Sequence, residues 1–154
     1  MAKQSAGLLV YRIKDNEPEL FLVHPGGPFW AKKDEGAWSI PKGEFGEEEE
    51  ALPAAKREFR EETGFSIEGD FQRLTPVRQA GGKIVHAWAV EGDADASAIH
   101  SNTFSMEWPP KSGKQQQFPE VDRAGWFKFP EAGKKILKGQ APLLEELEKI
   151  IESS

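Results

Sequence analysis

Three glutamates stand within five positions of the segment REFREETG, residues 57–64. Glu58 and Glu62 are four residues apart, Glu61 directly precedes Glu62, and Arg57 directly precedes Glu58. On a helix, like charges at spacings of three or four residues repel each other by about 0.2–0.5 kcal/mol per pair. Either solvent and neighbouring bases compensate this repulsion, or the carboxylates bind a cation that the chain does not itself supply.

The segment that carries these glutamates has the start and stop signals of a helix over residues 50–63. Pro53 is tolerated only in the first turn, which places the helix start near Glu50. Gly64 is a natural C-terminal cap, because glycine adopts the left-handed conformation at low cost. The sequence therefore predicts that the glutamates lie on one helix.

A helical wheel at about 100° per residue sorts the charges of this segment by sign. Glu58 and Glu62 fall together on one flank with Glu61 beside them, while Lys56 and Arg60 fall on the opposite flank. Ordinary solvated helices more often mix signs to form i,i+4 pairs. The face expected to meet the core comprises Leu52, Ala55, Phe59 and Thr63.

A flank of two or three carboxylates suits a hard divalent cation such as Mg²⁺, which prefers oxygen ligands and bridges carboxylates to substrate phosphates. The turn at residues 41–43 (Pro-Lys-Gly) lies just upstream, and its backbone carbonyls could add an oxygen ligand. Zinc has little support, because the chain has no cysteine and its three histidines, His24, His86 and His100, are scattered. Spacing alone leaves a solvated acidic helix as the alternative to a metal site.

The elements around this helix predict a layered α/β or α+β domain with a mixed sheet. The apolar patterns indicate a polar loop over residues 25–36, a short strand entered at residues 37–43, and a terminal amphipathic helix over residues 142–151. A short helix is expected within residues 130–139. Further strands are expected at residues 5–13, 19–24, 71–79, 83–92, 103–108 and 124–129.

The composition narrows the class of protein. The chain has 154 residues, so we expect one domain, and 38% hydrophobic residues argue against disorder. The net charge of −6 disfavours a nucleic-acid partner, and no apolar run is long enough to span a membrane. The N-terminus lacks the pattern of a signal peptide, so a cytoplasmic location is expected.

The stretch from Gly43 to Phe65 resembles the signature of the Nudix hydrolase family. That signature reads Gly, five residues, Glu, seven residues, Arg-Glu, an apolar residue, any residue, Glu-Glu, any residue, Gly and an apolar residue. The resemblance implies the family's α/β/α sandwich with a mixed β-sheet, covering residues 1–154. The matching positions are Gly43, Glu49, Arg57, Glu58, Phe59, Glu61, Glu62, Gly64 and Phe65.

The resemblance also implies hydrolysis of a nucleoside diphosphate linked to another group, with Mg²⁺ or Mn²⁺ as cofactor. By position, Glu58 and Glu62 are expected to ligate the metal, and Glu61 to join them or to position the attacking water. A backbone carbonyl at Lys42 or Gly43 would complete the site. Glu49 and Arg57 are expected to pair and so to brace the loop against the helix.

Many family members use a further glutamate outside this signature as general base or as an extra ligand. Glu120, which leads into the strand predicted at residues 124–129, is the favoured candidate. Glu107 is the second candidate, and either could be an ordinary surface carboxylate.

The substrate is less sharply defined, and a small-molecule nucleotide is the expected partner. The segment WSIPKGE, residues 38–44, resembles the entry to the signature in members that act on dinucleoside polyphosphates or diphosphoinositol polyphosphates. Hydrolases that remove modified nucleoside triphosphates share it, so that activity is the alternative, with a non-catalytic nucleotide sensor as a third reading. Ala80 stands where enzymes acting on ADP-ribose often carry proline, which disfavours that substrate.

Candidate substrate contacts lie on both sides of the signature. Lys42, Lys111 and Lys114 are candidate phosphate ligands, the last two within the Pro-, Gly- and Lys-rich segment 109–114. Aromatic residues that a base could stack on are Phe29, Trp30 and Trp38. Core packing is the commoner role for a strand tryptophan such as Trp38, and His86, which alternates with apolar residues, is expected to be structural.

Overall fold

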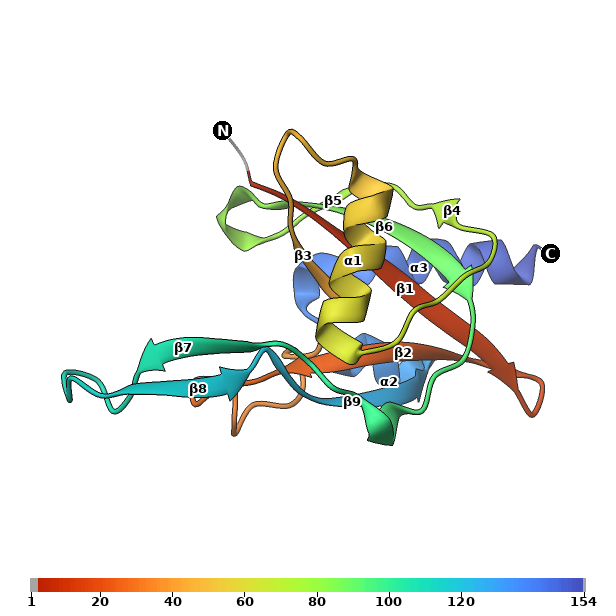
Figure 1. Ribbon diagram of the computed structural model, residues 1–154. Helices are drawn as coiled ribbons and strands as arrows, with labels where there is room; N and C mark the ends of the chain where they lie inside the picture. The colour runs from red at the N-terminus through yellow and green to blue at the C-terminus, as the bar shows by residue number, and fades with distance from the viewer. Residues whose placement is uncertain (1–2, 154) are drawn as a thin grey trace.

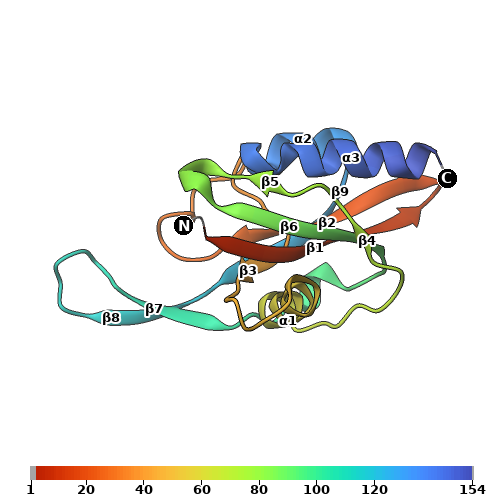
Figure 2. The ribbon, with the colours of Figure 1, turned by 90° about the horizontal axis from the view of Figure 1, so that it is seen from above.

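The computed structural model describes residues 3–153, and in this range a seven-stranded mixed sheet separates α1 from α2 and α3 (Figures 1 and 2). The expectation of an α/β/α sandwich with a mixed sheet is confirmed. The helices are α1 (Ala51–Thr63), α2 (Phe129–Lys135) and α3 (Ala141–Glu152), with 3₁₀ turns η1 (Ala80–Gly82), η2 (Ala96–Ala98) and η3 (Lys138–Gln140). The strands are β1 (Gln4–Lys14), β2 (Glu17–Pro25), β3 (Lys42–Glu44), β4 (Gln72–Arg73), β5 (Val77–Arg78), β6 (Ile84–Glu91), β7 (Thr103–Glu107), β8 (Gln115–Pro119) and β9 (Val121–Lys128).

The sheet is built around β1, which is buried over most of its length and runs parallel to β6. Its neighbours β2 and β3 pair with it in antiparallel fashion, and β9 extends the sheet beyond β2. A strand with both faces covered needs a nearly continuous apolar run, and the segment GLLVY in β1 supplies one.

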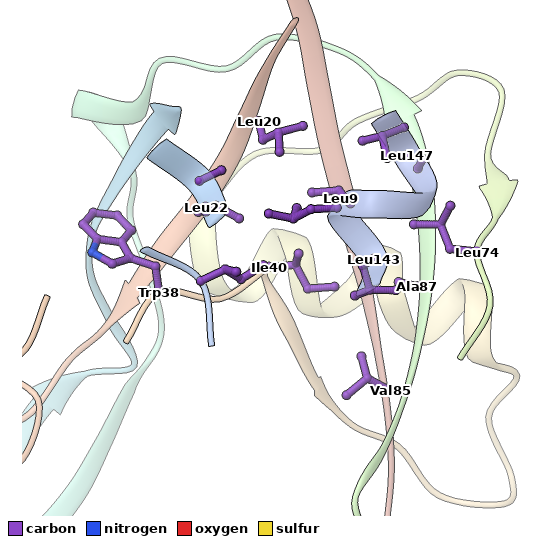
Figure 3. Packing of buried hydrophobic residues seen from close by; sticks show 14 residues of the cluster. Leu9, Leu20, Leu22, Trp38, Ile40, Leu74, Val85, Ala87, Leu143 and Leu147 are labelled. Carbon is purple, nitrogen blue, oxygen red and sulfur yellow. The ribbon is translucent and has the colours of Figure 1, made fainter. Parts of the chain in front are cut away.

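Each face of the sheet has its own hydrophobic cluster. The cluster between the sheet and α2 and α3 includes Leu9, Leu22, Ile40, Leu143 and Leu147 (Figure 3). The cluster under α1 includes Leu8, Phe21, Phe59, Trp88 and Val90. Because β1 contributes alternate residues to the two clusters, α1 is held on a rigid platform.

Helix α1 follows its sequence signals closely. Its N-cap is Glu50, and Gly64 caps the C-terminus with a φ of 82°. Phe59 and Thr63 are fully buried as the wheel predicts, whereas Leu52 is only partly buried. The buried stripe is wider than the wheel indicates, because Ala54 and Glu58 are also buried.

The strand predictions outside the signature at residues 43–65 are less accurate. The strand expected at residues 71–79 is two short strands, β4 and β5, interrupted around Pro76, which has no N–H to donate to the sheet. The strand expected at residues 103–108 is β7, which pairs only with β8, a strand that the sequence did not reveal. The hairpin of β7 and β8 extends away from the sandwich (Figure 1).

The C-terminal elements also differ in detail from expectation. The strand expected at residues 124–129 begins earlier, at Val121, and the short helix expected within residues 130–139 ends at Lys135. Within residues 3–153, none of the helices is both long and apolar enough to cross a membrane.

Candidate active site

Arg57 is the centre of the charged face of α1. Its Nε and Nη2 donate to the two carboxylate oxygens of Glu49 at 2.9 Å each, so the expected pair is present. Its Nη1 donates to Glu58 at 2.8 Å and to both oxygens of Glu61 at 2.9 Å. These bonds, led by the one to Glu49, raise the pKa of Arg57, and the same bond lowers the pKa of Glu49. One guanidinium thus offsets part of the repulsion among three carboxylates.

Glu58 and Glu62 lie where α1 faces β3. Glu62 accepts a hydrogen bond of 3.2 Å from the backbone N–H of Lys42. Burial, followed by the charge of Glu58, raises the pKa of Glu62 to about 8. Burial also raises the pKa of Glu58. A Cβ added to Gly43 would lie 2.0 Å from the Glu58 carboxylate, so glycine lets β3 approach the helix.

The donor set of this region fits a hard divalent cation in its chemistry. Two neighbouring carboxylates whose pKa values are raised by burial are groups that a cation would stabilise in their ionised form. In residues 3–153, however, no three acidic or histidine side chains converge into a ready-made metal cluster. Arg57 instead holds both oxygens of Glu61 and one oxygen of Glu58 in hydrogen bonds.

A cavity of about 160 Å³ opens beside these carboxylates. Its polar lining consists of Ser39, Lys42, Glu62 and Glu120, and its apolar lining includes Val23, Trp30, Ile40 and Leu137. Burial lowers the pKa of Lys42, and burial followed by the charge of Glu61 raises the pKa of Glu120. The structure therefore brings Glu120 and Lys42 to the same cavity as Glu62.

The backbone of Glu120 is tied to both sides of the cavity. Its N–H donates to the carbonyl of Asn102 at 2.8 Å, and the Asn102 N–H donates to the carbonyl of Glu61 at 2.8 Å. On the other side, the Gly26 N–H donates to the Glu120 carbonyl at 3.0 Å. A Cβ added to Gly26 would lie 2.0 Å from the carbonyl oxygen of Pro119. Sequence reasoning missed Asn102 and Gly26, because both act through backbone contacts that leave no local pattern.

Gln140 is a second residue that the sequence did not reveal. Its fully buried amide accepts from the Ile40 N–H at 3.0 Å and donates to Ser39 Oγ at 2.9 Å and to Gln79 Oε1 at 2.7 Å. Since Ser39 and Ile40 line the cavity, this amide fixes one of its walls from the start of α3.

Glu107, Lys111 and Lys114 do not reach the cavity. Glu107 accepts hydrogen bonds of 3.1 Å from the backbone N–H groups of Lys111 and Gly113. It therefore stabilises the turn between β7 and β8, where both lysines are exposed. The composition of this turn suggested a phosphate-binding loop, but the hairpin carries it away from the cavity.

Trp38 lies in the core and is 4% exposed (Figure 3). Its ring packs edge to face on Phe127 and His24, with centroids 5.0 and 5.3 Å away, and its Nε1 donates to Asp34 at 2.8 Å. Stacking on a substrate base is not open to it in this arrangement. Trp30, in contrast, lines the cavity. His86 bonds to Gln4 at 2.6 Å, far along the sequence, in keeping with a structural role.

The comparisons with known proteins agree with this architecture. The model of the NUDIX domain matches residues 1–147. The chain is similar to the structure of a C. elegans Ap4A hydrolase binary complex, with a TM-score of 0.71. The two are 21% identical in sequence, and the match covers 99% of this chain and 100% of that one. No match is found among curated proteins.

Two further solved structures share the fold at lower identity. One is the NUDIX domain of Shewanella oneidensis NrtR, solved with ADP ribose. It is 16% identical, with a TM-score of 0.69 and coverage of 98% of this chain and 89% of that one. A structure from an analysis of MutT from Aliivibrio salmonicida and Vibrio cholerae is 16% identical, with a TM-score of 0.56 and coverage of 94% of this chain and 93% of that one. The chain belongs to the Nudix family, and its complete signature places it with the hydrolases of that family.

Proposed function

We propose that the chain is a divalent-metal-dependent pyrophosphohydrolase that cleaves a nucleoside polyphosphate, with a dinucleoside polyphosphate as its substrate. The observation that carries this proposal is the pair of carboxylates where α1 meets β3: Glu58 lies against Gly43, and Glu62, which accepts from the Lys42 N–H, lines a cavity. Such a pair is costly to ionise without a cation, and a metal bound to a diphosphate supplies one.

Glu58 and Glu62 would hold the metal, Mg²⁺ or Mn²⁺, together with the backbone carbonyl of Lys42 or Gly43. When bound, such a metal neutralises the diphosphate and lowers the pKa of a water molecule. Arg57 orients Glu58 and keeps Glu61 close to it, and Glu49 anchors Arg57. Glu61 would join the metal site or position water only after loosening its bonds to Arg57.

Glu120 would accept a proton from the attacking water, a role supported by its presence in the same cavity lining as Glu62. Its raised pKa brings the carboxyl closer to the range in which a general base works near neutral pH. Lys42 lines the same cavity, so its ammonium group can contact a phosphate oxygen there. The apolar wall formed by Trp30, Ile40 and Leu137 excludes water from one side of the reacting groups.

The choice of a dinucleoside polyphosphate is supported by the segment WSIPKGE and by the fold shared with the Ap4A hydrolase. A modified nucleoside triphosphate is the second candidate, because a cavity of about 160 Å³ has room for about one ring system. ADP-ribose is disfavoured by Ala80, which lies in the η1 turn away from the cavity lining.

The test is a substrate panel measured with Mg²⁺ and with EDTA. It contains dinucleoside polyphosphates, modified deoxynucleoside triphosphates, ADP-ribose and diphosphoinositol polyphosphates, ranked by kcat/KM. We expect dinucleoside polyphosphates to rank first and Glu62→Gln to abolish turnover. Activity that survives EDTA, or survives Glu62→Gln, would contradict the proposed chemistry, and a different leading substrate would replace the proposed one.

A further inference from the structure

Phe29 is unusually exposed for an aromatic side chain. In the described part of the chain, Phe29 and Ile13 are the exposed large hydrophobic residues, with exposed fractions of 64% and 48%. The Phe29 ring meets Trp108 edge to face, with ring centroids 5.8 Å apart and an interplanar angle of 76°. Two aromatic rings from segments far apart in the sequence thus meet at the surface.

The loop that carries Phe29 is held in place at both ends. The Gly26 N–H donates to the Glu120 carbonyl, and His24 Nε2 lies 2.6 Å from the carbonyl oxygen of Lys33. Between these anchors, a Cβ added to Gly27 would lie 2.9 Å from Cζ of Phe104 in β7. The loop therefore rests directly on the hairpin, and the position of Phe29 is set by it.

The hairpin is an arm that the main sheet does not support. β7 and β8 pair only with each other, and an isolated two-stranded hairpin is marginally stable in water. Its partly buried side chains include Phe104 and Phe118, whose ring centroids are 6.0 Å apart. Trp108 directly follows β7, and its backbone N–H donates to the Lys114 carbonyl at 2.9 Å. We call residues 26–34 together with residues 103–119 the hairpin wall.

The hairpin wall continues the surface of the cavity. Trp30 lines the cavity, and Phe29 is its neighbour in the chain. The strand β8 leads directly into Glu120, which lines the cavity. On the other strand of the hairpin, Trp108 lies six residues beyond Asn102, which corresponds to about 20 Å of extended chain. A cavity of about 160 Å³ takes about one ring system, so a ligand that also reached Phe29 and Trp108 would need a second ring on a long connector.

The charges of the hairpin wall suit a connector made of phosphates. Lys32 and Lys33 follow Phe29 in the loop, and Lys111 and Lys114 lie in the turn after Trp108. In residues 3–153, none of these four lysines forms an ion pair with an acidic side chain. The wall holds these four lysines against two acidic residues, Asp34 and Glu107, so on a chain of net charge −6 it carries a local positive excess that attracts a polyanion.

We propose that Phe29 and Trp108 form a second aromatic subsite, which stacks the distal nucleobase of a dinucleoside polyphosphate. This inference rests on the proposed function, because it assumes that the diphosphate is bound beside Glu62. The first base lies in the cavity against Trp30, the phosphates pass the lysines, and the second base packs against Phe29 and Trp108.

The test compares two substrates that differ only in the second nucleoside, diadenosine tetraphosphate and adenosine 5′-tetraphosphate. For Phe29→Ala and Trp108→Ala, we expect kcat/KM for the two-base substrate to fall about tenfold more than for the one-base substrate. Trp108→Phe keeps a ring and should recover most of this selectivity. Ile13→Ala, which removes the other exposed hydrophobic side chain, should change neither substrate.

Equal losses for the two substrates, or no loss, would overturn the subsite. If the wild-type protein hydrolyses neither substrate, the proposed function fails, and the subsite is tested by calorimetric binding of the same two nucleotides. Tighter binding of diadenosine tetraphosphate that Phe29→Ala removes supports the subsite, and equal affinities overturn it. Light scattering covers self-association, because a wild-type dimer that Phe29→Ala converts to a monomer would also overturn it.

Discussion

The two sides of the candidate site are held together by different kinds of contact. On the side of α1 and β3, a single residue, Arg57, bonds to three carboxylates that are close in the sequence. On the hairpin wall, residues far apart in the sequence are held by backbone hydrogen bonds and aromatic contacts, and Phe29 is left exposed. The first side is held by hydrogen bonds between charged groups, and the second by backbone hydrogen bonds and aromatic packing.

This difference suggests a division of labour. Substitutions on the α1 side should act on metal binding and kcat, because the charged groups that they disturb include the carboxylates proposed to hold the metal. Substitutions of Phe29, Trp108 and the lysines of the hairpin wall should act on substrate selectivity, because these side chains are not part of the cavity lining. Glu120 connects the two sides. Its backbone carbonyl accepts from the Gly26 N–H, and its N–H donates to Asn102, whose own N–H donates to the carbonyl of Glu61 in α1.

Among substitutions that leave the proposed metal ligands intact, the largest expected effect is at Glu120. Glu120→Gln removes the proposed general base while keeping the size of the side chain, so kcat should fall by about 10²–10⁴-fold. Metal affinity, measured by calorimetry, should change little. Glu107→Gln is the matched control, because Glu107 bonds only to backbone N–H groups of the hairpin turn. Equal effects of the two substitutions would remove Glu120 from the reaction and leave the two sides without a shared catalytic group.

The next effect tests the α1 side alone. Arg57→Met keeps much of the side-chain length but releases Glu49, Glu58 and Glu61, so kcat should fall by about 10–100-fold. Metal affinity should change with it, because the carboxylates lose the group that orients them. Arg60→Met is the control, since Arg60 lies on the same helix and is exposed. A change in the ratio between two-base and one-base substrates would contradict the division of labour.

How far the sequence anticipated each side follows from the range of the contacts. The bounds of α1 could be anticipated because caps and helical spacing are local signals, and the pairing of Glu49 with Arg57 was anticipated from the resemblance to the Nudix signature. The strand β8 reads QQQFP and has one partly buried residue, so it carries no alternating pattern to detect. Lys111 and Lys114 were expected near phosphates from composition, which does not reveal that they lie on a hairpin outside the cavity lining. Asn102, Gly26 and Gln140 act through long-range hydrogen bonds and could not be found from local patterns.

A smaller effect tests the close approach on the hairpin wall. In Gly26→Ala, the new methyl group must move the chain at Pro119, because it would otherwise lie 2.0 Å from the carbonyl oxygen. The shift displaces Glu120 by a fraction of an ångström to an ångström, and kcat should fall about 10-fold or more. Gly133→Ala in α2 is the control, because a Cβ there meets no atom within 4 Å, and it should raise stability slightly. Full activity in Gly26→Ala would show that Glu120 tolerates this movement.

The smallest effect concerns the free energy of unfolding of the metal-free protein on the α1 side. The pKa of Glu62 is raised from 4.5 to about 8, chiefly by burial, so the native state keeps a proton that the unfolded state releases. Between pH 5 and pH 8 the native state therefore binds more protons, and its stability falls as the pH rises. In EDTA we expect the melting temperature to drop on the order of 5 °C across this window. Burial lowers the pKa of His86, so its contribution to the pH dependence of stability has the opposite sign. Because His86 is present in both proteins, this contribution cancels when wild type is compared with Glu62→Gln. Glu62→Gln should flatten the decline of melting temperature with pH, and Glu107→Gln should not. Equal slopes in wild type and both variants would mean that the charge on the α1 side is already balanced without a metal.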